Sequence, residues 1–183
     1  MWPWGHAAVG YILWVAIVRI YRREWPTRDE IIVVLAGTQV PDLVDKSLAW
    51  TFGFLPSGRS LAHSLLTAIV VIAIVLTICR YYERIELAAA FSIGYLSHLF
   101  TDLPDAVLSG DFSRATFLFW PLLPSPEYST EQSLVAHLLI DDITKPFLIQ
   151  LLLAAVLILV SIINVIIIRA ERRTHGDTRQ RRL

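Results

Sequence analysis

A small set of histidine, aspartate and arginine side chains lies within or beside the apolar stretches of this 183-residue chain. These residues are His6, Asp42, Asp45, Arg59, His63, His98 and Asp102. Imidazole and carboxylate groups are the ligands that Zn²⁺, Mn²⁺ and Fe²⁺ accept in proteins. Because ionisable groups are costly to place in lipid, they are candidates for function. Cys79 is the one cysteine, which excludes an intramolecular disulfide and a thiolate cage.

The spacing of these residues indicates a metal site. His98 and Asp102 are four positions apart, so a helix places them on one face. Asp42 and Asp45 follow Pro41 in a similar arrangement. We predict a divalent cation, with zinc favoured and Mn or Fe also fitting the donor set. Its predicted ligands are His6, Asp42, His63, His98 and Asp102.

The remaining polar residues have predicted roles around this ion. Asp45 is a further ligand or the general base that takes a proton from water, unless it only pairs with Lys46 or caps a helix. Arg59 stabilises developing phosphoryl charge, or else only contacts lipid phosphate. His137 and Asp141 repeat the spacing of four and could form a second metal site, although a solvated helix face is the simpler interpretation.

Composition places the chain in a membrane. Hydrophobic residues make up 55% and charged residues 17%, with a mean hydropathy of +0.57, whereas soluble domains contain about 25% charged residues. Basic and acidic residues balance at 16 each, which excludes a strongly basic nucleic-acid-binding protein. We therefore expect membrane lipids as partners and no nucleic acid.

Charge-free runs predict the membrane spans. The segments 60–79 and 146–168 contain no charged residue, and a bilayer core needs ~20 such residues. Residues 5–20 and 86–101 are further candidates, the latter rich in small residues that suit close helix packing. The run from Ile31 to Val40, before Pro41, is too short to cross alone, so it belongs to a broken or continued helix, and the segment 31–45 either spans or re-enters. The prediction is an all-α, polytopic bundle of about five spans.

Arginine distribution orients this bundle. All basic residues except Lys46, Arg59, Arg114 and Lys145 fall on one side if the N-terminus is outside and the C-terminus inside. Residues 1–168 then form the membrane-embedded domain and residues 169–183 a basic cytoplasmic tail. The long segment 103–145 becomes an outer loop, in which Ser129 and Gln132 predict the start of a short amphipathic helix.

This orientation brings the candidate residues to one membrane face. Each lies at the extracytoplasmic end of its segment: His6 at the first, Asp42 and Asp45 at the second, Arg59 and His63 at the third, and His98 and Asp102 at the fourth. Because the orientation came from the arginines, this convergence supports a shared site independently.

A series of short motifs over roughly residues 5–125 resembles a known family. They are His6, the segments 37–45, 59–64 and 94–102, and the segment 117–122. The pattern is similar to the membrane-bound metal-dependent hydrolases described as LexA-binding, inner-membrane-associated hydrolases, although Gly58 stands where that family commonly has a histidine. More distantly, the order of ligands is similar to that of zinc-dependent phospholipase C. That resemblance implies that Asp42, His63, His98 and Asp102 hold one zinc, and that His6 helps to hold a neighbouring ion sharing Asp102.

The sequence therefore predicts a multi-pass cell-membrane metallohydrolase with its site on the extracytoplasmic side. Its substrate would be a phosphoester or another ester, carried by a lipid or a small molecule. One alternative is a non-catalytic membrane anchor or regulatory binding protein stabilised by the same metal, which expects a closed coordination shell. Another is a transporter or proton relay, which expects ionisable residues along the whole bilayer depth and not at one end.

Overall fold

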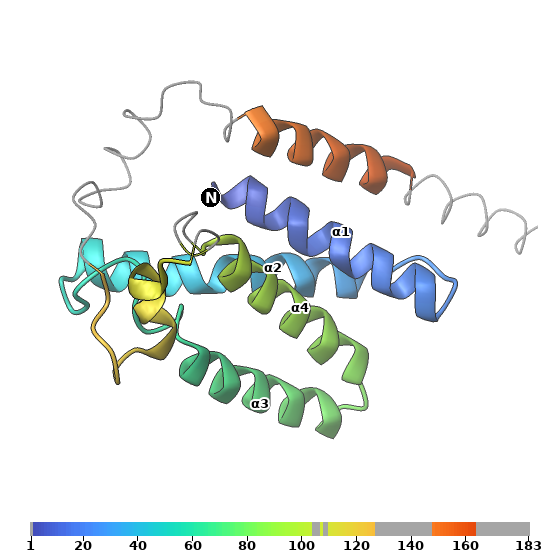
Figure 1. Cartoon of the computed structure of the whole chain (residues 1–183). Coiled ribbons are helices and arrows are strands. Elements are labelled where there is room, and N and C mark those ends of the chain that lie inside the picture. Colours follow the sequence, from blue (N-terminus) through green and yellow to red (C-terminus); the bar gives the residue numbers. More distant parts are fainter. Residues whose placement is uncertain (1, 104–106, 108–109, 127–147, 164–183) are drawn as a thin grey trace, which may run out of the picture.

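The computed structural model describes residues 2–103, 107, 110–126 and 148–163, and in these ranges it contains helices and no strand. Its elements are α1 (Pro3–Tyr21), α2 (Arg28–Lys46), the π-helical turn η1 (Ser47–Thr51), α3 (Leu65–Tyr81), α4 (Ile85–Thr101), the 3-10 helix η2 (Phe112–Phe119) and a helix at Leu148–Ile163. Figure 1 shows α1, α2, α3 and α4 as a bundle, in which α1, α2 and α4 contact one another and α3 contacts α4. The all-α prediction is confirmed.

The close crossing of α2 and α4 forms the centre of the bundle, and glycine makes it possible. A β-carbon at Gly94 would collide with the carbonyl oxygen of Val34. A β-carbon at Gly37 would lie only 2.5 Å from the carbonyl oxygen of Phe91. With any residue other than glycine at these two positions, the two backbones could not approach so closely. The small residues of α4 predicted such close packing.

Helix α1 packs against both members of this pair. Trp14 and Val18 of α1 are buried with Val34 of α2 and Ala90 of α4. At the other end of α1, the amide of Trp2 donates a hydrogen bond of 2.7 Å to Oε1 of Gln150 in the helix at Leu148–Ile163. That helix therefore lies beside the start of α1, as Figure 1 also shows.

The structure decides one helix assignment that the sequence left open and corrects one predicted helix boundary. Helix α2 continues through Pro41 to Lys46 without a break, so the segment 31–45 belongs to one helix that begins at a capping box of Thr27 and Glu30. Helix α3 begins at Leu65 and not at residue 60, because Ser64 caps it by accepting a hydrogen bond from the amide of Leu66.

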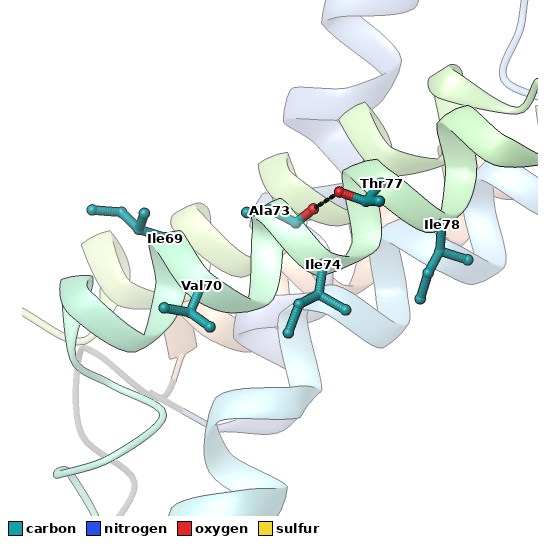
Figure 2. Close-up of a pocket in the computed structure, with 6 residues that line it drawn as sticks. All are labelled: Ile69, Val70, Ala73, Ile74, Thr77 and Ile78. Carbon is teal, nitrogen blue, oxygen red and sulfur yellow. Dashed lines mark hydrogen bonds between the residues drawn. The ribbon is translucent and has the colours of Figure 1, made fainter.

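Helix length identifies one candidate membrane span among the described residues, α1. The apolar helices α3, α4 and Leu148–Ile163 are shorter, so an arrangement of about five spans is not confirmed. The outer face of α3 is nevertheless apolar, with an open groove lined by Ile69, Val70, Ala73, Ile74, Thr77 and Ile78 (Figure 2). The hydroxyl of Thr77 donates to the carbonyl oxygen of Ala73 at 2.8 Å, which satisfies this polar group within the helix, as a lipid environment requires.

Candidate metal centre

Four side chains meet at one end of the α2–α4 pair. Asp42 comes from α2, His63 from the turn before α3, His98 from the last turn of α4, and Asp102 from the residue that ends α4. All four are buried, and each offers one ligand atom within 4.8 Å of the others. These four residues, which lie far apart in the sequence, therefore meet in one cluster, and their role as metal ligands stays a prediction.

The ligand atoms face one another at short distances. The two Nε2 atoms of His63 and His98 are 3.1 Å apart. Nε2 of His63 lies 3.6 Å from Oδ1 of Asp42 and 3.5 Å from Oδ2 of Asp102. Nε2 of His98 lies 3.7 Å and 4.0 Å from the same two oxygens. Two nitrogens and two carboxylate oxygens thus surround one small volume.

Hydrogen bonds on the far side of each ring fix its tautomer. Nδ1 of His98 lies 2.6 Å from the carbonyl oxygen of Thr38, which can only accept, so Nδ1 carries the proton. Nδ1 of His63 lies 2.8 Å from Oδ2 of Asp45 and donates to that carboxylate. When each ring is neutral, its Nε2 carries no proton and faces Nε2 of the other ring.

A cation fits this arrangement of donors. Oδ1 of Asp42 is buried and has no hydrogen-bond partner, although buried polar atoms are normally paired. Two nitrogen lone pairs and two carboxylate oxygens repel one another without a positive charge between them. The donor set of two imidazoles and two carboxylates matches zinc, and also Mn and Fe. The described residues therefore provide a group that could hold a metal ion, whose identity the geometry does not select.

Asp45 contacts the Nδ1 side of the His63 ring and is not one of the four clustered residues. Its Oδ2 accepts hydrogen bonds from Nδ1 of His63, from the amide of His63 and from the amide of Ser60, and its Oδ1 accepts from the amide of Ala62. The backbone of the turn 60–63 thus curves around this carboxylate, whose hydrogen bond to Nδ1 orients the His63 ring. Both oxygens are engaged, which argues against the predicted role of Asp45 as general base and against its role as a ligand. The predicted pair of Asp45 with Lys46 is wrong, because Lys46 binds Asp42 instead.

His6 reaches the site from α1 but lies beside the four-residue group. Its ring stacks on that of His98 with centroids 3.9 Å apart. Its Nδ1 lies 2.8 Å from Oγ1 of Thr101, and its Nε2 lies 3.2 Å from Oδ1 of Asp102. His6 therefore contacts the oxygen of Asp102 that points away from His63 and His98.

Two cationic side chains border the centre. Nε of Arg59 lies 2.9 Å from Oδ2 of Asp102, and Nζ of Lys46 lies 2.7 Å from Oδ2 of Asp42. The side chains of Arg59 and Lys46 are 21% and 20% exposed, so each connects a buried carboxylate with the surface. Lys46 and Thr38 were not among the predicted site residues. The i,i+4 spacing of Asp42 and Lys46 could have identified the first, but no sequence signal marks a backbone carbonyl such as that of Thr38.

Some predictions fall on residues that the structure does not describe. These are His137 and Asp141 of the proposed second site, the amphipathic helix near Ser129, and the tail 169–183. The division into domains 1–168 and 169–183 remains a prediction for the same reason.

Comparison with known proteins corrects the resemblance given above. A family model described as "YdjM inner membrane protein" matches residues 1–173. No curated protein and no solved structure matches the chain. The assignment to metal-dependent hydrolases and the similarity to phospholipase C are therefore wrong, because the matching family is described as a membrane protein and no hydrolase similarity accompanies it. The chain belongs to the YdjM inner membrane protein family.

Proposed function

We propose that this inner membrane protein is a metal-dependent hydrolase that acts on a phosphoester or another ester, most favourably one carried by a lipid. The observation that carries the proposal is the approach of Nε2 of His63 to Nε2 of His98, 3.1 Å apart and flanked by oxygens of Asp42 and Asp102. A divalent ion bound there would supply a water acidic enough to lose a proton near neutral pH.

The protein groups have distinct parts in this proposal. His63, His98, Asp42 and Asp102 hold the ion, and Asp45 keeps the His63 ring in the tautomer that leaves Nε2 free to bind. The hydrogen bond from Nδ1 of His98 to the Thr38 carbonyl does the same for the second ring. Neither ring needs to rotate when the ion enters, so the site is preorganised.

The charges around the centre favour an anionic substrate. Asp42, Asp45 and Asp102 contribute three negative charges, and Lys46 and Arg59 contribute two positive charges. A divalent ion brings the cluster to a net charge of one positive unit, which attracts an anion. Because Arg59 is partly exposed and holds Asp102 through Nε, its guanidinium would lie close to an ion bound by Asp102, where it could stabilise developing phosphoryl charge.

The proposed topology follows the arginines. We place the N-terminus outside and the C-terminus inside, with α1, α3, α4, the helix at Leu148–Ile163 and α2 as a bundle of about five passes and the centre at the extracytoplasmic interface. The buried contact of His6, near the start of α1, with Asp102, at the end of α4, supports one shared end for these helices.

Metal analysis and substrate screening test the proposal together. Protein purified in mild detergent should carry about one divalent ion per chain, and it should release nitrophenol from a chromogenic phosphodiester, phosphomonoester or carboxylester. The His98→Ala variant should lose both properties. Metal bound at full stoichiometry in that variant, or hydrolysis equal to the wild type, would overturn the assignment.

A second candidate function has an observation in its favour. Four buried protein ligands match the closed shell of a structural zinc site, as expected for a non-catalytic membrane anchor or regulatory binding protein. Cobalt substitution separates the two candidates. The visible spectrum of the Co²⁺ form should change when inorganic phosphate is added to an open hydrolytic site, and should stay unchanged for a closed structural site.

A further inference from the structure

Two loops near the metal centre expose large apolar side chains. The first follows η1 and carries Phe52 and Phe54, whose rings lie 5.9 Å apart and are 61% and 76% exposed. The second is η2 with the residues after it, and it exposes Phe112, Phe119, Leu122 and Leu123. We call these six residues, four phenylalanines and two leucines, the aromatic rim.

Hydrogen bonds attach the aromatic rim to the site. The hydroxyls of Ser57 and Ser125 are 2.7 Å apart, and Ser125 donates to the carbonyl oxygen of Arg59 at 2.6 Å. Ser64, next to His63, donates to the carbonyl oxygen of Trp120 at 2.7 Å. The two loops are therefore fixed to each other and to the segment that supplies Arg59 and His63. Figure 1 shows η2 at the same end of the bundle as the C-terminal end of α2.

Cationic side chains lie near the aromatic rim. Arg59 and Lys46 border the metal centre and are partly exposed, and Arg114 of η2 is exposed between Phe112 and Phe119. Aromatic side chains next to cations suit the boundary between acyl chains and phosphate headgroups, and suit a water-filled surface poorly.

The first helix places this end of the bundle at a membrane interface. Helix α1 is the candidate span, and Trp2 and Trp4 stack at its beginning with centroids 4.8 Å apart. Tryptophans are enriched at the level of the headgroups. His6, one turn further along α1, contacts Asp102 of the metal centre. The centre and its loops therefore lie near the depth at which α1 enters the bilayer.

From these observations we infer that the aromatic rim inserts into the lipid leaflet around the metal centre and holds the acyl chains of the substrate, so that the substrate is a bilayer lipid with an anionic phosphoester headgroup. The role in catalysis rests on the proposed function. Insertion of the aromatic rim into the leaflet does not depend on it.

A pair of substrates tests the catalytic part. In the Phe52→Ser, Phe54→Ser double variant, turnover of phosphatidylglycerol in vesicles should fall at least about tenfold, while hydrolysis of soluble bis-nitrophenyl phosphate should stay within about twofold of the wild type. Ile20→Ser is the matched control, because Ile20 is 69% exposed near the other end of α1. Its turnover of both substrates should match the wild type. An equal loss of both activities in the double variant, or no loss of lipid turnover, overturns the inference.

Fluorescence tests the insertion without any activity. A bimane label on Phe54→Cys, in a Cys79→Ser background, should be quenched by lipids brominated in their acyl chains when the protein is in vesicles. The same label on Glu24→Cys, exposed after α1, should be quenched much less. A label at position 54 that is quenched no more than the control shows that the aromatic rim faces water or protein, and refutes the inference. If the wild type hydrolyses neither substrate, the proposed function fails while this measurement still decides whether the aromatic rim meets lipid.

Discussion

Nε2 of His63 and Nε2 of His98 lie 3.1 Å apart, although the Nδ1 atom of each ring already donates its proton to an oxygen on the opposite side. Two neutral imidazoles cannot form a hydrogen bond to each other in this state, because neither facing nitrogen carries a proton. The contact is stable only when a cation or an added proton lies between the rings. A divalent ion would satisfy both rings and the adjacent oxygens of Asp42 and Asp102 at once.

Replacing His98 by alanine should therefore abolish metal binding. The variant keeps three ligand groups but loses one of the two nitrogens, and we expect the metal content to fall from about one ion per chain to near zero after dialysis. Elemental analysis by mass spectrometry gives this number directly. His175→Ala, in the predicted cytoplasmic tail, is the matched histidine control and should keep its metal. Equal metal content in the two variants would refute the centre.

Asp45 should tune the metal affinity without being a ligand. Its oxygens bind Nδ1 of His63 and three amides of the turn 60–63. In Asp45→Asn the ring loses its charged partner, so the metal affinity should fall roughly tenfold to hundredfold, as for other groups that orient a ligand. Competition with a chromogenic chelator measures the change. Asp42→Asn removes the negative charge of a proposed ligand and should weaken binding further. A larger effect at position 45 than at position 42 would reverse the two assigned roles.

Arg59 should matter for turnover more than for metal binding. Its Nε holds Asp102 at 2.9 Å, and the side chain reaches the surface beside the centre. We expect Arg59→Gln to retain its metal and to lower kcat/KM for a phosphodiester by roughly a hundredfold, because a fixed positive charge beside the developing negative charge is lost. Arg59→Lys should recover part of the activity. Arg28→Gln, at the exposed start of α2, should leave kcat/KM unchanged. Loss of the metal together with activity in Arg59→Gln would make Arg59 a structural residue.

The sequence predicted the members of the centre better than their roles. His98 and Asp102 could be recognised because their spacing of four fits a helix, and His63 because an ionisable group in an apolar run needs a partner. The role of Asp45 could not be recognised, since it depends on the path of the turn 60–63, which curls back onto that carboxylate. Pro41 left open whether the helix breaks or continues there, because proline removes a helical hydrogen bond. In the structure α2 is continuous through Pro41 and packs against α4.

The length of the spans was harder to predict than their apolar character. A charge-free run from residue 60 to residue 79 reads as one span, yet Ser64 caps α3 and leaves residues 60–63 outside the helix. A segment without charged residues is either buried in the protein or in contact with lipid. The buried turn 60–63 lacks charged residues just as a membrane-spanning helix does. A prediction from hydropathy alone therefore makes α3 too long at its beginning, next to His63.

The crossing of α2 and α4 should be sensitive to a single methyl group. A β-carbon at Gly94 would collide with the carbonyl oxygen of Val34, and a rigid backbone cannot move aside as a side chain can. We expect Gly94→Ala to destabilise the protein by about 1–3 kcal/mol, the usual range for overpacking, and to lower the thermal midpoint in detergent. Ser92→Ala on the same helix only removes a hydroxyl that bonds to the carbonyl oxygen of Ala88, and it should be nearly neutral. A midpoint for Gly94→Ala equal to that of Ser92→Ala would contradict the close crossing.

The orientation of the bundle should follow its arginines. The turn between α1 and α2 and the turn between α3 and α4 carry arginines, whereas the metal centre lies at the opposite ends of these helices. We therefore expect a fluorescent protein fused after residue 183 to fold and fluoresce in the cytoplasm, and alkaline phosphatase fused there to be inactive. Alkaline phosphatase inserted after Gly53, beside the centre, should be active because the proposed orientation puts that loop outside. Activity of the phosphatase at the C-terminus, or its inactivity at position 53, would invert the topology and move the metal centre to the cytoplasmic face.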